Sequence, residues 1–275
     1  MTRPALSRLP LGLLSAAALA LTLAASAQNL KPVPQEDVDK LNALVGTAPT
    51  AKPAKARRIL VFWRCEGFVH GKGIEYGNQA IASAAAQTKA YHADFSSDYA
   101  DLRRANLDTY DAVVLNNTTQ LNTQEHRFIE PDLIAYVRSG KGLAVIHAGA
   151  DNFYKAEQAA EMVGGRFWGH PWGSGGTWAF KLDEPAHPLN RAFDGKSFTF
   201  GDEIYQQQSP VYNRAKLRVL VSLDLSDKAP ADAAGQRRAD RDYAVSWIRP
   251  YGKGRVFYTS FAHDQRAFLD KPVLT

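Results

Sequence analysis

Along the first half of the chain, short apolar runs alternate with longer stretches that carry apolar side chains on one side only. Runs rich in β-branched or aromatic residues, at the length of a strand, are typical of strands buried in a parallel sheet. They lie at 59–63, 90–95, 111–116 and 143–146. Residues 74–88 and 123–139 have the spacing of helices, and Pro131 marks a kink or a late start in the second. This order predicts right-handed βαβ units and a parallel sheet covered by helices.

Beyond a loop rich in glycine, tryptophan and histidine, the pattern changes to short strands in which apolar and polar residues alternate. These strands are predicted at 177–182, 217–223, 243–249 and 255–260. Pro250-Tyr251-Gly252-Lys253-Gly254 separates the last two and is a strong hairpin turn. The predicted fold class is therefore α/β, a mainly parallel sheet with helices on both faces and an antiparallel extension.

The first 27 residues are predicted to be a secretory signal peptide. Arg3 and Arg8 give a basic start, residues 11–25 are apolar, and Ala25-Ser26-Ala27 is a small-residue cleavage pattern. The apolar stretch of about 15 residues is shorter than the ~20 that a spanning helix needs, which favours cleavage over an uncleaved anchor. We expect a mature chain that starts near Gln28, keeps no stable membrane anchor, and is periplasmic or secreted.

Residues 28–56 are predicted to be an extension and linker with a short helical patch at 38–44, and order is expected to begin at Arg57. Residues 57–270 suit one large α/β domain in length. The formal charge of +5 is scattered except for a short basic cluster at 237–241, in a predicted loop. Nucleic-acid binding needs a concentrated basic stripe, so no nucleic-acid partner is expected. The composition leaves open whether the chain forms an oligomer.

Cys65 is the only cysteine in the sequence. It cannot form an internal disulfide, so the fold must depend on its core. We interpret Cys65 as a buried small hydrophobe rather than as a reactive thiol.

Polar side chains gather just after the predicted strands. In open parallel sheets, ligands bind beyond the carboxyl ends of the strands, so these positions predict a site. The residues are His70 after the first strand, His147 and Asp151 after the fourth, and His263 and Asp264 after the last. Their convergence is more informative than any one of them alone.

His147 directly follows a strand, in a turn that would expose one side chain over the sheet as a nucleophile elbow does. No Ser or Cys stands there, which disfavours covalent catalysis. His147 is a candidate general acid or base, a candidate metal ligand, or a buried histidine that fixes the turn. Glu203 is a candidate base or ligand beside Asp202, since a strand would point one acid inward and the other outward.

Trp168 and His170 lie among glycines in a loop that suits a sugar ring, unless the loop is packed by its own tryptophans. His263 and Asp264 are candidates for a second acid/base pair, with the alternative that Asp264 caps the next helix. The candidate ligands of a divalent metal such as zinc are His70, His147, His170 and His263. No close-spaced His-x-x-x-His or Cys-x-x-Cys pattern occurs, so spacing alone leaves the cofactor unassigned.

A series of blocks completes the pattern. They include Tyr110-Asp111-Ala112-Val113-Val114-Leu115, Ile146-His147-Ala148-Gly149-Ala150-Asp151, Gly164-Gly165-Arg166-Phe167-Trp168-Gly169-His170-Pro171, His187-Pro188-Leu189, Asp202-Glu203-Ile204-Tyr205, and Ala262-His263-Asp264. In order and spacing, from about Arg57 to Phe268, the chain resembles the ThuA-like family, which is named for a trehalose-utilisation protein.

The resemblance implies a flavodoxin-like sheet with extra strands, similar to that of class I glutamine amidotransferases. It also implies carbohydrate metabolism around trehalose, related disaccharides or their keto forms. Amidotransferases need a cysteine at the elbow, which this chain lacks, so their chemistry does not carry over. Family members usually continue into a last helix with an Arg-Gly-x-x-Trp-like stretch, whereas this chain stops at Thr275. The terminal helix is therefore expected to be missing or truncated.

The leading hypothesis is an exported enzyme that acts on a disaccharide, glycoside or keto-sugar by general acid/base chemistry, with or without a metal. The catalytic candidates are His147, Glu203 and His263, and the substrate-binding candidates are His70, Asp151, Trp168, His170 and Asp264. The alternative is a non-catalytic sugar-binding protein outside the cytoplasm, with Trp168 and Trp172 as platforms. A Cys65-dependent hydrolase or amidotransferase is the third reading.

Overall fold

The computed structural model describes residues 29–228 and 234–275. The predicted signal peptide, residues 1–27, lies outside the described residues.

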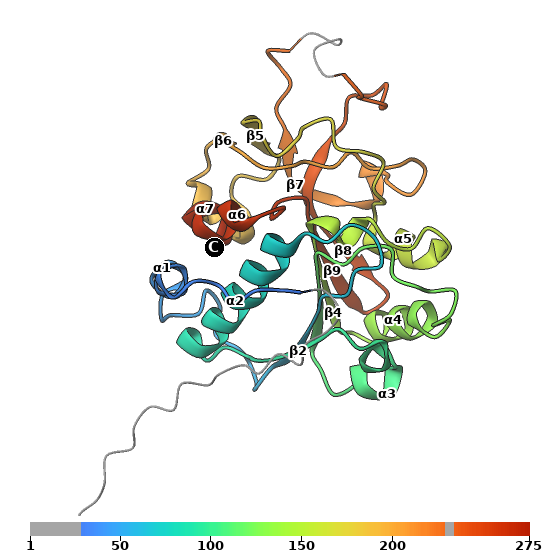
Figure 1. Ribbon diagram of the computed structural model, residues 1–275. Coiled ribbons are helices and arrows are strands. Elements are labelled where there is room, and N and C mark those ends of the chain that lie inside the picture. The colour runs from blue at the N-terminus through green and yellow to red at the C-terminus, as the bar shows by residue number, and fades with distance from the viewer. Residues whose placement is uncertain (1–28, 229–233) are drawn as a thin grey trace, which may run out of the picture.

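The described strands form one sheet (Figure 1). They are β1 (Arg58–Phe62), β2 (His92–Ser96), β3 (Ala112–Asn116), β4 (Gly142–Ile146), β5 (Trp178–Leu182), β6 (Phe198–Phe200), β7 (Arg218–Leu223), β8 (Ala244–Tyr251) and β9 (Gly254–Thr259). Their order is β2-β1-β3-β4-β9-β8-β7-β5-β6. The pairs from β2 to β9 are parallel, and the pairs from β9 to β6 are antiparallel. The predicted parallel sheet with an antiparallel extension is confirmed, and β6 is a strand that the pattern did not predict.

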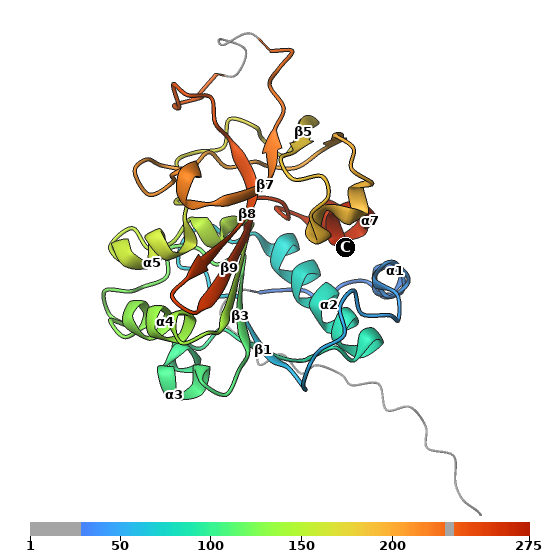
Figure 2. The ribbon, with the colours of Figure 1, turned by 180° about the vertical axis from the view of Figure 1, so that it is seen from behind.

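Helices cover both faces of the sheet. They are α1 (Gln35–Val45), α2 (Gly71–Thr88), α3 (Arg104–Leu107), α4 (Ile129–Arg138), α5 (Glu157–Val163), α6 (Gln265–Leu269) and α7 (Lys271–Leu274). Short 3-10 helices are η1 (Tyr99–Leu102), η2 (His147–Ala150), η3 (Pro188–Phe193) and η4 (Arg214–Lys216). In Figures 1 and 2, α1 and α2 lie on one side of the strands and α3, α4 and α5 on the other.

Helix α4 begins later than the predicted range of 123–139. It starts at Ile129 and places Pro131 in its first turn. A proline is tolerated there because the first backbone N–H groups of a helix have no intrahelical acceptor. Pro131 therefore marks a late helix start and not a kink.

The largest apolar core lies between the sheet and helices α4 and α5. Leu60 and Phe62 of β1 and Leu115 of β3 point into it and pack with Leu133 and Val137 of α4. Each such side chain stabilises the fold by roughly 1.5–3 kcal/mol when it is fully buried. This packing fixes the strands whose carboxyl ends carry the candidate site.

The extension before β1 is part of the folded body, contrary to the expectation that order begins at Arg57. Helix α1 covers and lengthens the predicted helical patch at 38–44. Its Leu41 is completely buried with Tyr76 of α2, and the Tyr76 hydroxyl donates to Asp37 at 2.5 Å. Burial of Leu41 and the hydrogen bond between Tyr76 and Asp37 therefore help to attach the extension to α2.

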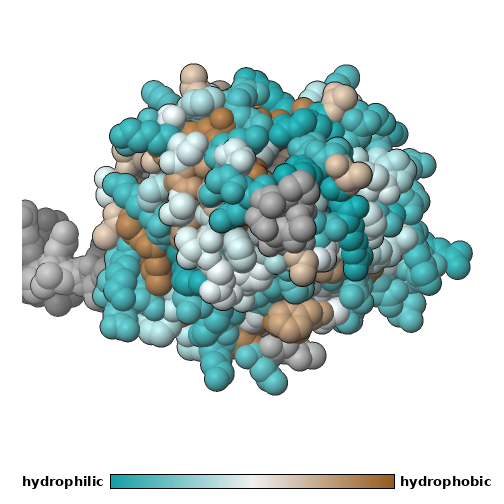
Figure 3. All heavy atoms as spheres, turned by 90° about the horizontal axis from the view of Figure 1, so that it is seen from above, coloured by the Kyte–Doolittle hydropathy of each residue, from teal (hydrophilic) through white to brown (hydrophobic). Residues whose placement is uncertain are grey.

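From above, the surface is mostly hydrophilic, and its hydrophobic residues form small separate patches (Figure 3). Among the helices of the described residues, none has the length and apolar character to span a bilayer.

Candidate functional site

The first helix after β1 brings His70 close to the segment that follows β9. His70 is the N-cap residue of α2. A Cβ on Gly73, one turn further on, would lie 2.8 Å from the carbonyl oxygens of both Ala262 and His263. Only glycine permits so close an approach of the helix to that backbone. His70 and His263, which are far apart in the sequence, therefore have ring centroids 5.1 Å apart.

His147 occupies a turn of the predicted kind, because it directly follows β4 and is the first residue of η2. Its backbone has a φ of 45°, which is uncommon for a residue with a Cβ and typical of strained functional turns. The His147 side chain is 0% exposed, which matches the alternative of a buried histidine in the turn and not that of an exposed side chain. Nδ1 lies 2.6 Å from the carbonyl oxygen of Ser260, so Nδ1 carries a proton that it donates to this oxygen.

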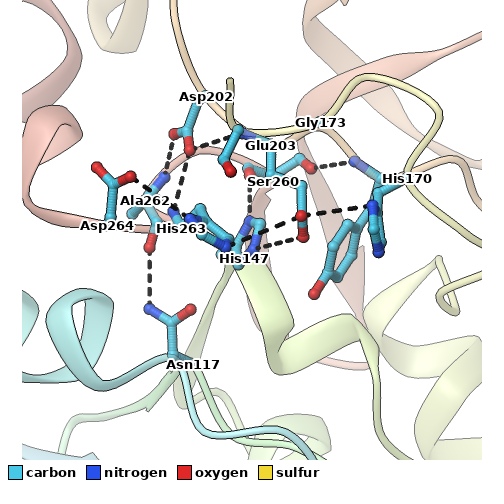
Figure 4. Close-up of polar contacts among 12 residues, drawn as sticks. Asn117, His147, His170, Gly173, Asp202, Glu203, Ser260, Ala262, His263 and Asp264 are labelled. Atoms are coloured by element: carbon cyan, nitrogen blue, oxygen red, sulfur yellow. Dashed lines mark hydrogen bonds and ion pairs between the residues drawn. The ribbon is translucent and has the colours of Figure 1, made fainter. Parts of the chain in front are cut away.

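Glu203 lies at the centre of a group of imidazoles (Figure 4). Its Oε1 is 3.7 Å from Nε2 of His147. Its Oε2 is 3.4 Å from Nδ1 of His170 and 3.8 Å from Nε2 of His263. Burial alone would raise the pKa of Glu203, but the facing imidazoles of His147, His263 and His170 outweigh it, so the pKa is lowered. The carboxylate is thus held in its charged form beside nitrogen donors.

Asp202 fixes the backbone that carries Glu203 and His263. Its carboxylate accepts from the backbone N–H groups of Glu203 at 2.8 Å, Ala262 at 2.7 Å and His263 at 3.2 Å. Asp202 is 1% exposed and Glu203 9%, so both acids are buried and the inward–outward alternation expected for a strand is wrong. The segment after β6 is irregular, with isolated bridges from Ile204 to Trp172 and from Gln207 to Phe167, so no strand period applies.

His70 and His147 are both buried and complete the cluster with His263. Their ring centroids are 4.9 Å apart, and the rings of His147 and His263 are 5.4 Å apart. Burial and the charges of the three neighbouring histidines lower the pKa of His70 to about 2. His70 is therefore a neutral imidazole under ordinary conditions.

Asp264 caps the next helix, as one of the two alternatives predicted. It is the N-cap residue of α6, where its side chain accepts from the backbone N–H of Arg266. Its Oδ2 also lies 3.5 Å from Nδ1 of His263. Burial alone would lower the pKa of His263, but Asp264, Glu203 and Asp202 outweigh it and raise the pKa. His263 thus lies between two carboxylates, with Nε2 toward Glu203.

Two other predicted residues lie outside the cluster. The Asp151 carboxylate accepts from the Tyr154 hydroxyl at short range, and burial raises its pKa. Trp168 is partly buried, with the guanidinium of Arg237 5.5 Å from the centre of its ring. Trp172, the second predicted platform, is buried against Tyr243 at a centroid distance of 4.5 Å, so a sugar cannot stack on it.

Two exposed aromatic side chains near the site, Phe68 and Tyr154, were not predicted from the sequence. Phe68 is 68% exposed, and its ring centroid is 4.8 Å from that of His70. Tyr154 is 43% exposed and lines a hollow of about 330 Å³ together with Glu66 and Gln120. Phe68 lies just before His70 and Tyr154 just after Asp151, and this closeness to candidate site residues could have identified them in the sequence.

Cys65 is buried, as expected. Its Sγ lies 3.2 Å from the carbonyl oxygen of Asn117, and burial raises the pKa of its thiol. A raised pKa disfavours the thiolate that a cysteine nucleophile needs.

The chain is similar to a known protein family in sequence and to solved structures in fold. A family model described as trehalose utilisation (ThuA) matches residues 58–275. A thua-like protein from Bacteroides uniformis ATCC 8492 is similar in structure, with a TM-score of 0.64, 20% identity, and coverage of 82% of this chain and 91% of that chain. A thua-like protein from Parabacteroides merdae ATCC 43184 has a TM-score of 0.55 and 15% identity, and covers 80% of this chain and 88% of its own. No curated protein matches the chain.

Proposed function

Because the chain belongs to the ThuA family of trehalose utilisation, we propose that it is an enzyme that transfers a proton on a disaccharide, glycoside or keto-sugar. The observation that carries the proposal is the Glu203 carboxylate, which faces the nitrogens of His147, His170 and His263 at 3.4–3.8 Å. Convergent titratable groups in a shared, partly buried site are typical of acid/base catalysis.

In this proposal Glu203 takes a proton from a hydroxyl, or from a carbon beside a carbonyl group of the sugar. His170 has the most exposed side chain of the cluster, 49%, and binds a hydroxyl group. His147 is a positioning residue that acts through Glu203, because its buried side chain cannot touch a substrate. General acid/base help of this kind contributes about 10²–10⁴-fold to the rate.

The aromatic side chains support a sugar as the ligand. Phe68 beside His70 offers a flat apolar face, which suits the C–H face of a pyranose ring. Trp168 and Tyr154 add partly exposed aromatic surface on neighbouring segments. A sugar stacked on Phe68 would have its hydroxyl edge toward the histidines.

The test is turnover by the purified chain. Trehalose, other disaccharides and their 3-keto derivatives are each incubated with wild type, with Glu203→Gln, and with the surface control Glu184→Gln. We expect product with wild type and with the control, and at least about a 100-fold lower rate with Glu203→Gln. Binding of a sugar without any product would contradict the enzyme and favour the non-catalytic sugar-binding protein.

Two finer proposals go with this function. The order β2-β1-β3-β4-β9 supports a flavodoxin-like sheet of the kind found in class I glutamine amidotransferases, with His147 where those enzymes have their cysteine. The basic, apolar and small-residue pattern of residues 1–27 supports export to the periplasm or the medium. N-terminal sequencing of the protein from the periplasmic fraction should read from Gln28, and a retained Met1 would contradict cleavage.

A further inference from the structure

The donor atoms at the centre of the cluster have the arrangement of a metal site. We infer that His70, Glu203 and His263 bind a divalent cation of the zinc class. One ligand atom from each residue lies within 4.8 Å of the other two. The three residues come from the start of α2, the segment after β6 and the segment after β9, so only the folded chain assembles them.

The distances are close to those that a shared ion requires. Zinc binds imidazole nitrogen and carboxylate oxygen at about 2.0–2.2 Å, so two donors of a tetrahedral ion lie about 3.4 Å apart. Nε2 of His263 and Oε2 of Glu203 are 3.8 Å apart, too far for a hydrogen bond and near that spacing. Two imidazole rings on one such ion have centroids about 5 Å apart, and those of His70 and His263 are 5.1 Å apart.

Hydrogen bonding leaves the required nitrogens available. His70 is buried, and its Nδ1 has no hydrogen-bond partner. A buried polar atom without a partner calls for an explanation, and a metal ion is one of the accepted ones. Nδ1 of His263 faces the Asp264 carboxylate at 3.5 Å, which leaves Nε2 free toward Glu203. Carboxylate, histidine and metal are arranged in this way in many zinc sites.

The chemistry of the donors favours the same ligand. The ring centroids of His70, His147 and His263 lie within 5.4 Å of one another. Neutral imidazole is the form that binds a metal, and one carboxylate with two imidazoles is the ligand set of several catalytic zinc enzymes. Three protein ligands leave a fourth position for a sugar hydroxyl or water, whose acidity the ion would increase.

Metal binding is measured separately from turnover. The full chain is treated with a chelator and titrated with Co²⁺, and the visible absorption of the bound ion is recorded, followed by displacement with Zn²⁺. We expect one ion per chain. His263→Ala and Glu203→Gln should each weaken binding by at least about 100-fold, because loss of a direct ligand costs more than loss of its supporting hydrogen bond. His92→Ala, an exposed histidine outside the cluster, is the matched control and should bind as wild type does.

Circular dichroism shows whether each variant is folded. If a variant does not fold, thermal unfolding of wild type decides: Zn²⁺ should raise its midpoint and a chelator should reverse the rise. The inference is overturned if wild type binds no ion, if Zn²⁺ leaves the midpoint unchanged, or if folded His263→Ala binds as tightly as wild type. A bound ion without turnover would refute the proposed function alone, and turnover without a bound ion would refute the metal site alone.

Discussion

Asp202 gives the sharpest test of how the site is held in place. In Asp202→Asn one carboxylate oxygen is replaced by an amide NH₂ group. This group cannot accept hydrogen bonds from the backbone N–H groups that point at it in wild type. The Glu203 and His263 N–H groups share Oδ1 and the Ala262 N–H uses Oδ2, so the asparagine must leave one side without an acceptor. A hydrogen bond to a charged acceptor contributes about 1.5–3 kcal/mol.

Burial raises the pKa of Asp202, so desolvation of the carboxylate offsets part of the stabilisation that its hydrogen bonds provide. We therefore expect Asp202→Asn to lower the free energy of unfolding by about 2 kcal/mol, near the low end of that range. For a chain of this size the midpoint of thermal unfolding should fall by about 4–8 °C.

Urea unfolding of wild type and Asp202→Asn at neutral pH measures the difference. Asp224→Asn is the matched control: Asp224 is partly exposed and accepts from the N–H of its neighbour Ser226 at 3.1 Å, so its loss should cost no more than about 0.5 kcal/mol. If Asp202→Asn unfolds at the same free energy as that control, the three backbone contacts do not stabilise the fold and this reasoning fails.

Three further outcomes are expected. Lys55 and other cationic neighbours lower the pKa of Asp111 to about 2. The stabilisation from the charged Asp111 is therefore complete above about pH 4 and is lost as pH falls toward 2. In acid unfolding, Asp111→Asn should lack this loss of stability, which is worth about 1 kcal/mol after solvent screening. Gly254→Ala would place a Cβ 2.0 Å from the carbonyl oxygen of Val137 and should cost about 3 kcal/mol in urea unfolding. Cys65→Ser should keep turnover within about twofold, and full inactivation of a folded variant would revive the thiol reading.

The strands β1, β3 and β4 could be predicted because a parallel strand is buried on both faces and has an unbroken apolar sequence. The gathering of His70, His147 and His263 could also be predicted, since it needs only the rule that ligands meet the carboxyl ends of such strands. Asp202 could not, because the segment that carries it is irregular and its contacts are with the backbone of a distant loop. Nor could the burial of Trp172, which depends on Tyr243.

Among the described strands, β9 alone pairs in parallel on one side and antiparallel on the other, between β4 and β8. His263 leaves this strand near the end of the chain, and His70 precedes α2 near its beginning. During synthesis, His70 therefore cannot contact His263 until almost the whole described chain has been made. The cluster is therefore a set of high contact order, formed in the slow closing steps of folding, and no nascent fragment that lacks β9 can assemble it.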